Sequence, residues 1–288
     1  MAELLKGAPV SAVLDEETGK AAEGLKTRGV QPKLVLLRVG EKPEDLTYRK
    51  SILKRCEKTG ICVEESCFSE AAETEELTAR IRELNSDGSV HGVLMFLPFP
   101  KTGRIDERAV RETLDPGKDV DGCTQASLAG VFTGSGVGFA PCTAQAVMEM
   151  ISYYGIPVSG KRVTVLGRSL VVGRPLSMLL LGQNATVTIC HTKTENLNTV
   201  TSQAEILIST VGKAGLVDEN CLGEGQTVLD VGISWNEAEG KLCGDVKAEA
   251  AQAKTAAYTP VPGGVGGVTT SVLAKHVTEA ALRQSAKG

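Results

Sequence analysis

The sequence predicts an α/β fold in two domains, each with a parallel sheet flanked by helices. Short apolar runs alternate with helical patterns in the first half of the 288 residues, and the alternation restarts near residue 161. A glycine-rich stretch, residues 130–143, separates the two halves. Alternation of this kind is typical of parallel strands with helices across their faces. The length suits one large domain or two medium-sized ones, and either can bury a core.

The first half contains three expected helices and two expected strands. The helical patterns place apolar residues three or four positions apart, and glycines end the first two of them. The strands are short apolar runs, and prolines stop the second one. We expect helices at residues 10–29, 44–60 and 73–88, and strands at residues 33–40 and 91–100.

The second half contains four strand-like runs and two helical patterns. The first run is followed by a helix with proline in its first turn, which is a favoured position for proline. The tail of the chain forms one further helical pattern. We expect strands at residues 161–167, 184–190, 204–210 and 226–232, and helices at residues 174–183 and 269–288.

Composition argues against several classes of protein. The apolar runs are far shorter than the roughly 18 residues that a membrane span needs. The N-terminus has no basic flank ahead of a long apolar region, as a secretory signal does. A net charge of −4 gives no reason to expect nucleic acid as a partner. The eight cysteines include no C-x-x-C pair, and no histidine stands near Cys56, Cys62 and Cys67. We therefore expect free thiols in a reducing cytoplasm and no metal site.

The strongest local motif is VTVLGRSLVVGRP, residues 163–175. A β-run ends at Gly167, a short turn follows, and a helix opens after Gly173. Backbone N–H groups at a helix N-terminus bind pyrophosphate when glycines permit close approach. The spacing is G-x5-G instead of G-x-G-x-x-G. An ordinary strand-to-helix turn therefore remains the alternative to a nucleotide site.

The residues after the next strand distinguish between cofactors. An acidic residue there holds the ribose 2′-hydroxyl of NAD, but this strand ends Cys190-His191-Thr192-Lys193. Arg168, Thr192 and Lys193 suit a 2′-phosphate instead. The sequence therefore favours NADP, with a solvated loop charge as the alternative for Lys193.

Two other glycine-containing stretches are candidates for ligand contact. TPVPGGVGGVTT, residues 259–270, is rigid at its prolines and permissive at its glycines, which lets backbone approach a ligand; a tight connection is the alternative. DPGKDVDGC, residues 115–123, presents Asp119 and Asp121, which point to one side if the segment is extended. Without a third partner nearby, these carboxylates do not predict a metal site.

A basic run, TYRKSILKRC, occupies residues 47–56. In a helix, Tyr48, Ile52 and Cys56 recur every four residues and share one face. Periodicity alone favours a core position for this face.

Taken together, the motifs resemble the methylenetetrahydrofolate dehydrogenase/cyclohydrolase family over nearly the whole chain. The stretches that carry the resemblance are Lys118–Gly122, Pro141–Thr143, Gly167–Ser169, Val172–Gly173 with Pro175, Ala185–Thr188, Cys190–His191, Asp230–Ile233, Gly244–Val246 and Thr259–Gly266. The resemblance implies a folate-binding α/β domain at residues 1–138, completed by the helix at 269–288. It implies a Rossmann-like NADP-binding domain at residues 139–268, and a homodimer joined through that domain.

The resemblance also assigns individual residues. Tyr48 matches the tyrosine that packs against the folate ring system. Asp121 matches the carboxylate that holds the pterin, which offers two parallel N–H bonds along one edge. The other folate-site positions are Leu97, Pro98, Pro262, Gly263 and Gly264. The cofactor positions are Gly167, Arg168, Ser169, Gly173, Thr192 and Ile233.

Two departures from the family pattern concern one place in the site. The family reads Y-x-x-x-K, but the lysine position holds Ile52; Lys50 and Lys54 stand two residues, about 200° of helix, to either side. The family strand reads V-Q-L-P-L-P, and its glutamine, which bonds the lysine, is Phe96 here. Losing one partner would leave the other unsatisfied, at a cost of about 1–3 kcal/mol. Losing both avoids that cost, so the two substitutions look coordinated.

Other departures surround the folate site. After Gly122 the family continues F-H-P-x-N-x-G, whereas this chain reads CTQASLA. After Thr143 the usual proline is Ala144, and after Gly266 the usual P-M is Gly267-Val268. The nucleotide turn keeps the family pattern.

The resemblance implies oxidation of 5,10-methylenetetrahydrofolate to 5,10-methenyltetrahydrofolate with NADP. Hydrolysis of that product to 10-formyltetrahydrofolate needs a positioned polar group to activate water and move a proton, work that the family assigns chiefly to the lysine. We therefore expect weak or absent cyclohydrolase activity. One alternative is a fully bifunctional enzyme, with Lys54 or a loop residue recruited after a helix shift. The other is a non-catalytic paralogue that binds folate or nucleotide.

Overall fold

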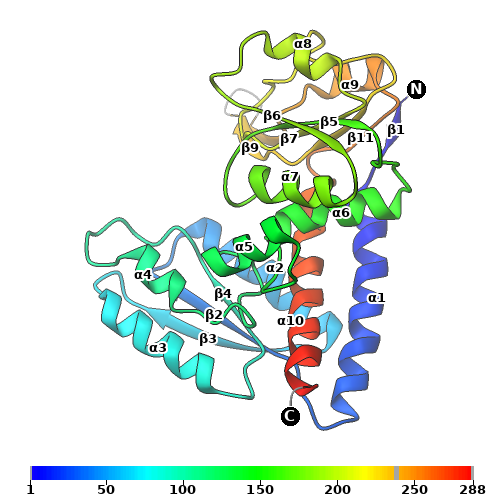
Figure 1. Ribbon diagram of the computed structural model, residues 1–288. Helices are drawn as coiled ribbons and strands as arrows, with labels where there is room; N and C mark the ends of the chain where they lie inside the picture. The colour runs from blue at the N-terminus through cyan, green and yellow to red at the C-terminus, as the bar shows by residue number, and fades with distance from the viewer. Residues whose placement is uncertain (1, 237–239, 287–288) are drawn as a thin grey trace. The chain divides into compact units, whose positions relative to one another are not determined.

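The computed structural model describes residues 2–236 and 240–286, and the chain divides into two compact units (Figure 1). The small-sheet unit comprises Val13–Cys142 and Thr270–Gly288. The large-sheet unit comprises Met1–Ala12 and Thr143–Thr269. The two-domain α/β fold predicted from the sequence is confirmed.

The small-sheet unit is built on three parallel strands in the order β3-β2-β4. The central strand, β2 (Lys33–Val39), is buried along almost its whole length, as the apolar run KLVLLRV predicts. Leu34 lies opposite Val63 on one neighbour and opposite Gly92 on the other. The outer strands are β3 (Cys62–Phe68) and β4 (Gly92–Met95).

The sequence analysis missed β3. This strand lies at an edge of its sheet, and six of its seven residues are exposed or half-exposed, on both faces of the pleat. Its sequence, CVEESCF, therefore has neither a continuous apolar run nor a regular alternation, which are the two patterns that reveal a strand.

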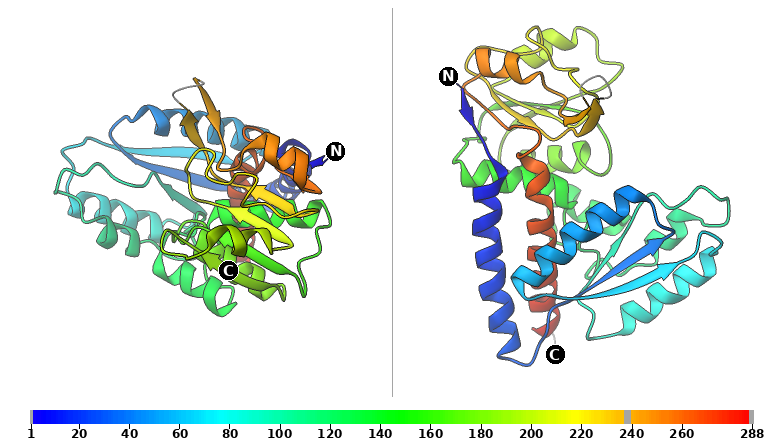
Figure 2. Two further views of the ribbon diagram at one scale, coloured as in Figure 1. Left: turned by 90° about the horizontal axis from the view of Figure 1, so that it is seen from above. Right: turned by 180° about the vertical axis from the view of Figure 1, so that it is seen from behind.

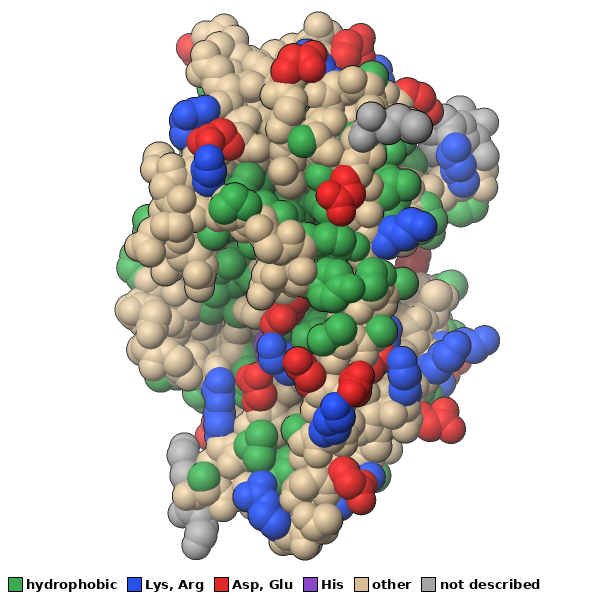
Figure 3. All heavy atoms as spheres, turned by 90° about the vertical axis from the view of Figure 1, so that its right-hand side faces the viewer, with side chains coloured by type: hydrophobic (Ala, Val, Ile, Leu, Met, Phe, Trp, Pro, Cys, Tyr) green, Lys and Arg blue, Asp and Glu red, His purple; other side chains and the backbone are tan. Residues whose placement is uncertain are grey.

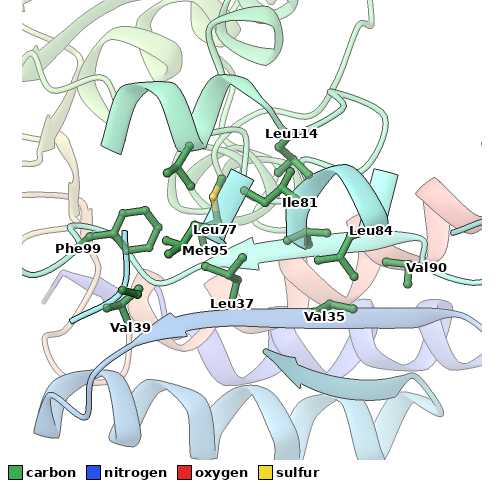
Figure 4. Packing of buried hydrophobic residues seen from close by; sticks show 13 residues of the cluster. Val35, Leu37, Val39, Leu77, Ile81, Leu84, Val90, Met95, Phe99 and Leu114 are labelled. Atoms are coloured by element: carbon green, nitrogen blue, oxygen red, sulfur yellow. The ribbon is translucent and has the colours of Figure 1, made fainter. Parts of the chain in front are cut away.

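Helices cover this sheet, and their bounds agree with the predicted helices where one was predicted. They are α1 (Gly7–Lys26, from residue 13 on), α2 (Pro43–Thr59), α3 (Thr74–Ser86), α4 (Glu107–Glu112), α5 (Gln125–Thr133) and α10 (Thr269–Ser285). Figure 4 shows the core between the sheet and α3, where Leu37 of β2 and Met95 of β4 meet Leu77 and Ile81 of the helix.

A buried carboxylate links three of these helices. Asp15 of α1 accepts hydrogen bonds from Ser271 of α10 at 2.9 Å and from Lys58 of α2 at 2.9 Å, and it pairs with Arg55 of α2. Both figures of the ribbon show α1 and α10 side by side (Figures 1 and 2). Because Asp15 is almost fully buried, its charge needs these partners to remain in the fold.

The large-sheet unit contains a six-stranded sheet in the order β1-β11-β8-β7-β5-β6, and every neighbouring pair is parallel. The chain leaves β5, forms β6 on one side of it and then β7 on the other. Such a reversal of strand order opens a crevice at the carboxyl ends of the strands. The strands are β1 (Glu3–Leu4), β5 (Arg162–Leu166), β6 (Thr186–Cys190), β7 (Ile206–Ser209), β8 (Thr227–Asp230) and β11 (Ala257–Tyr258).

In the described part of this unit, the remaining elements are four helices, a single turn of 3-10 helix and an antiparallel strand pair. They are α6 (Cys142–Tyr153), α7 (Gly173–Gly182), α8 (Leu197–Ser202), α9 (Ala248–Lys254), η1 (Val265–Gly267), β9 (Ser234–Asn236) and β10 (Lys241–Cys243). The four strands predicted for the second half are confirmed, each within a few residues.

Two segments differ from their sequence-based description. Residues 1–12 fall in the large-sheet unit, whereas the predicted boundaries placed them with residues 13–138; the reason is that Glu3 and Leu4 pair with Ala257 and Tyr258. The glycine-rich stretch 130–143, taken as a link, includes the end of α5 and the start of α6.

No helix within residues 2–236 and 240–286 is long and apolar enough to cross a membrane. On the face drawn in Figure 3, positive and negative side chains are interspersed over the surface. That face therefore lacks the one-signed basic patch by which proteins bind nucleic acid.

Truncation of Leu37 tests the importance of the small-sheet core. This side chain is fully buried in the centre of β2, so Leu37→Ala should lower the free energy of unfolding by about 2–5 kcal/mol. Denaturant unfolding followed by circular dichroism measures the change. As a control, Val13→Ala on the exposed side of α1 should change the free energy by less than about 0.5 kcal/mol. Equal losses in the two variants would contradict this account.

Candidate functional site

The face of α2 that carries Tyr48, Ile52 and Cys56 is core over most of its length. Ile52 and Cys56 are fully buried, as periodicity predicted, whereas Tyr48 is only half-buried. Tyr48 lies nearest the N-terminal end of the helix, which begins with proline at Pro43. The tyrosine is therefore the one member of this face that a ligand can reach.

Phe96 packs against Tyr48. The two ring centroids lie 5.9 Å apart with an angle of 66° between the planes, an edge-to-face arrangement that aromatic pairs favour. Phe96 follows β4, and its N–H donates to the carbonyl of Leu37 at 3.0 Å. Its side chain is buried. Apolar side chains thus occupy both positions, Ile52 and Phe96, where a lysine and a glutamine were expected from the family pattern.

The two carboxylates of the KDVDG motif have different roles in the structure. Asp119 is fully buried and accepts hydrogen bonds from the N–H groups of Cys123 at 3.0 Å and Thr124 at 2.8 Å, and from the Ser127 hydroxyl at 2.6 Å. It therefore holds its own loop. Asp121 is half-buried and does not take part in these bonds, which leaves it as the carboxylate available to a ligand.

The surroundings of Asp121 alter its acidity and that of Tyr48. Burial raises the pKa of Asp121 to about 6, and hydrogen bonds from Cys142 partly offset the rise. Burial and the nearby charge of Asp121 together raise the pKa of Tyr48 well above its ordinary value. Tyr48 is therefore a neutral hydroxyl at any physiological pH. The Asp121 carboxylate is close enough to the Tyr48 phenol to affect its pKa. The predicted folate site places both residues against one ligand.

The other predicted folate positions of the small-sheet unit follow Phe96 directly. Leu97 is half-buried and Pro98 is exposed. The Pro98 carbonyl accepts a hydrogen bond from Lys42 at 2.7 Å, which connects this turn to the residue before α2. The turn therefore lies beside the end of the helix that carries Tyr48.

The predicted phosphate turn lies between β5 and α7. Gly167 has a φ of +122°, and a Cβ there would lie 2.2 Å from the Thr210 hydroxyl oxygen. A Cβ on Gly173 would lie 2.2 Å from the Gly167 carbonyl oxygen. Only glycine fits at either position. The motif therefore packs the start of α7 directly on the end of β5, as dinucleotide-binding folds do.

Ser169 closes this turn. Its hydroxyl accepts the N–H of Val172 at 3.1 Å, and its carbonyl accepts the N–H of Arg174 at 3.0 Å. The side chain of Arg168 is exposed. The turn thus presents a positive charge to solvent at the N-terminus of a ten-residue helix, where an anion is favoured.

Thr192 and Ile233 lie at the same edge of the large sheet as the turn. Thr192 follows the carboxyl end of β6, which pairs with β5, and it is exposed like its neighbour Lys193. Ile233 follows β8 and is 53% exposed. The predicted cofactor positions therefore follow the C-terminal ends of parallel strands, where ligands of such folds bind.

A hollow of about 260 Å³ joins Ile233 to the glycine-rich loop 259–270. The predicted positions Pro262, Gly263 and Gly264 all line it, as does Asp230. Most of the surface that lines the hollow is apolar, which suits a flat ring.

Sequence reasoning missed the role of two buried carboxylates, Asp230, which lines this hollow, and Asp245. Asp230 accepts N–H bonds from Gly232, Asp245 and Val246 at 2.9–3.1 Å, and burial raises its pKa to about 7. Asp245 accepts bonds of 2.7 Å from Ser209, Val211 and Lys213. Together they fix the loops after β7 and β8. The signal in the sequence was that each aspartate lies within two residues of a glycine, in Asp230-Val231-Gly232 and Gly244-Asp245-Val246.

Family models match both parts of the chain. The catalytic domain of tetrahydrofolate dehydrogenase/cyclohydrolase matches residues 5–121, and the NAD(P)-binding domain of the same family matches residues 141–285. The bifunctional protein FolD of Clostridium kluyveri is 47% identical over 277 residues, which cover 96% of each chain.

Solved structures agree with these matches. The FolD methylenetetrahydrofolate dehydrogenase/cyclohydrolase of Campylobacter jejuni superposes with a TM-score of 0.94 at 37% identity, over 98% of this chain and 99% of that one. The Trypanosoma brucei enzyme, whose structure holds an NADP cofactor and an inhibitor, superposes with a TM-score of 0.91 at 30% identity, over 100% of this chain and 99% of that one.

The raised pKa of Asp121 has a consequence for stability. The ordinary value is 3.8, and the folded value is about 6, so ionisation of this carboxyl opposes folding above pH 6. Asp121→Asn should therefore be more stable than the unmodified chain at pH 8, by about 1–2 kcal/mol after allowance for partial exposure. The difference should shrink as the pH falls from 6 towards 4. Chemical unfolding at several pH values measures it.

Asp119→Asn is the matched control for this experiment. Its carboxylate accepts hydrogen bonds from two backbone N–H groups, a thiol and a hydroxyl within the fold, so the substitution should lower stability at pH 8. A loss of stability in Asp121→Asn at pH 8 would contradict the assignment of different roles to the two carboxylates.

Proposed function

The chain belongs to the tetrahydrofolate dehydrogenase/cyclohydrolase family, and we propose that it oxidises 5,10-methylenetetrahydrofolate with NADP while hydrolysing the methenyl product weakly or not at all. The observation that carries the second half of this proposal is the apolar pair Ile52 and Phe96 beside Tyr48. Membership confirms the predicted family and its class of enzyme.

The cofactor prediction is confirmed at the level of the family. Its second domain binds NAD(P), and the related Trypanosoma brucei structure contains NADP. The residues present fit NADP: Arg168 and Lys193 are exposed cations beside the turn, and the strand before Thr192 ends without an acidic residue. We assign Gly167, Ser169 and Gly173 to the phosphates and Ile233 to the nicotinamide end.

The chain's residues have a limited task in the oxidation. Hydride leaves the methylene carbon because the adjacent ring nitrogens stabilise the resulting cation, and bound NADP supplies the acceptor for it. Tyr48 offers a ring face and a neutral hydroxyl to the folate. Asp121 holds the pterin edge by paired hydrogen bonds. Holding the rings in place is the main requirement, and no acid or base is needed for this step.

Hydrolysis makes a different demand on the site. Water must be activated and a proton moved from a tetrahedral adduct, which a positioned acid or base accelerates about 10²–10⁴-fold. Ile52 and Phe96 offer no such group. Lys50 and Lys54 are exposed on α2, away from the face that carries Ile52. Their positions support the proposal and disfavour recruitment of Lys54.

The names of the relatives favour a second candidate, a fully bifunctional enzyme, because they describe both activities. Two assays on the purified chain distinguish the candidates. NADPH formation from methylenetetrahydrofolate tests the dehydrogenase, and its absence would leave a non-catalytic paralogue. Decay of methenyltetrahydrofolate absorbance tests hydrolysis, and enzyme-dependent decay well above the buffer rate would overturn the monofunctional proposal. Lys54→Met then shows whether that lysine is responsible.

Restoring the polar pair should restore hydrolysis. We expect the double variant Ile52→Lys/Phe96→Gln to hydrolyse methenyltetrahydrofolate at least about tenfold faster than the unmodified chain, because a lysine held by an amide can move the proton. Each single variant should be less stable than the unmodified chain by about 1–3 kcal/mol, since it buries one unpaired polar group. The double variant should lose less than the sum of the two.

The matched control for this experiment is Lys54→Ile in the double variant, which should leave the regained hydrolysis unchanged because Lys54 is exposed. A double variant that folds, oxidises methylenetetrahydrofolate and gains no hydrolysis would show that other departures, such as those after Gly122, prevent the second reaction.

We also propose that the protein is a cytoplasmic homodimer. All eight cysteines are free thiols, which suits a reducing compartment. In the large-sheet unit, Trp235 of β9 and Leu242 of β10 expose 61% and 45% of their surface, an apolar area that a second subunit would cover. Sedimentation equilibrium should give twice the chain mass of 30.2 kDa, and Trp235→Lys should shift it towards the monomer. A monomeric unmodified chain would contradict the proposal.

A further inference from the structure

Two buried side chains converge on the carbonyl that precedes Asp121. His276 of α10 places its Nδ1 atom 2.9 Å from the Val120 carbonyl oxygen, and Cys142 places its Sγ atom 3.3 Å from the same oxygen. We infer that His276 and Cys142 are positioning residues for Asp121, which they hold in the orientation needed to bind the folate ring. This inference rests on the proposed function of Asp121.

The chemistry of the contact fixes the proton on His276. A carbonyl oxygen only accepts hydrogen bonds, so the Nδ1 atom that faces it carries the hydrogen. The Sγ atom of Cys142 lies 3.7 Å from the same Nδ1 atom, which therefore faces the thiol as well as the carbonyl. Cys142 also influences the carboxylate, since hydrogen bonding from this residue lowers the pKa of Asp121 against the rise that burial causes. One residue thus contacts the carbonyl before Asp121 and alters the acidity of its carboxyl group.

The imidazole of His276 is held from the other side. Its ring stacks on that of Phe139, with centroids 4.9 Å apart and planes tilted by 37°. The guanidinium of Arg283 lies over the Phe139 ring at 4.3 Å and donates to the Gly138 carbonyl at 2.9 Å. His276 and Phe139 are both buried. The ring therefore has little freedom to turn away from Val120.

The residue after Asp121 is equally constrained. Gly122 has a φ of +64°, and a Cβ there would lie 2.5 Å from the Phe139 carbonyl oxygen and 2.5 Å from the Pro141 nitrogen. Asp121 therefore stands between a carbonyl fixed by His276 and a glycine packed on the 139–141 backbone. Paired hydrogen bonds to a ring edge require both carboxylate oxygens in place, so loss of one anchor should weaken folate binding.

A buried histidine can also be merely structural, and His91 provides that comparison. It lies in the same unit and is as buried as His276. Its Nδ1 atom accepts the N–H of Lys33 at 3.1 Å. His91 precedes β4, whereas Phe96, which packs on Tyr48, follows the opposite end of that strand. A substitution of His91 should therefore affect stability without affecting Asp121.

Kinetics of three variants test the inference. His276→Phe removes the donor and keeps a ring, and it should raise KM for methylenetetrahydrofolate about tenfold with kcat and KM for NADP within about twofold of the unmodified chain. His276→Asn should recover most of the affinity, because its amide can donate from nearly the same place. His91→Asn should leave both KM values unchanged. A KM in His276→Phe equal to that of the unmodified chain, or no recovery in His276→Asn, would overturn the inference.

A measurement without substrate separates this inference from the proposed function. The carboxyl ¹³C resonance of Asp121, assigned by its loss in Asp121→Asn, should move in His276→Phe and stay in place in His276→Asn and His91→Asn. Should His276→Phe fail to fold, Cys142→Ala removes the second contact, and its Asp121 resonance should move as well. An Asp121 resonance that stays in place overturns the inference, whereas absence of NADPH formation by the unmodified chain counts only against the proposed function.

Discussion

The fully buried carboxylate of Asp119 is the constraint on which the candidate folate site depends. It accepts hydrogen bonds from two backbone N–H groups and one hydroxyl of the loop that follows it. Without an internal partner, those donors and the charge itself would be unstable away from water. Because Asp119 satisfies them, the loop is held by its own hydrogen bonds, and Asp121 is left as the carboxylate proposed to bind the folate. In this proposal one carboxylate stabilises the loop and the other contacts the ligand.

The apolar side chains at positions 52 and 96 are the basis of the proposed loss of hydrolysis. Ile52 and Phe96 are buried and well packed, and the edge-to-face contact with Tyr48 is favourable. Hydride transfer requires rings held at short distance, whereas hydrolysis requires a proton carrier. Packing of side chains around the rings meets the first requirement, whereas the second needs a side chain that can accept and donate a proton. Two residues are therefore enough to account for the proposed loss of hydrolysis while oxidation is retained.

Much of the fold could be predicted from the sequence, and the reasons for the failures are physical. Central strands such as β2 and β8 appear as apolar runs because they are buried on both faces. The edge strand β3 and the two-residue strands β1 and β11 have no such pattern, since pairing alone defines them. Within the site, the glycine turn was visible because only glycine permits its backbone. The contact of His276 with Val120 joins residues that are 156 positions apart, and no local pattern reports it.

The glycine turn after β5 has a further meaning for cofactor choice. Its two glycines are fixed by backbone contacts within the protein, whereas the side chains assigned to the 2′-phosphate, Arg168 and Thr192, are exposed and support nothing in the core. On this assignment, stability and cofactor preference are encoded by separate residues. Substitution of the proposed 2′-phosphate contacts would change cofactor preference and leave the glycine contacts of the turn in place.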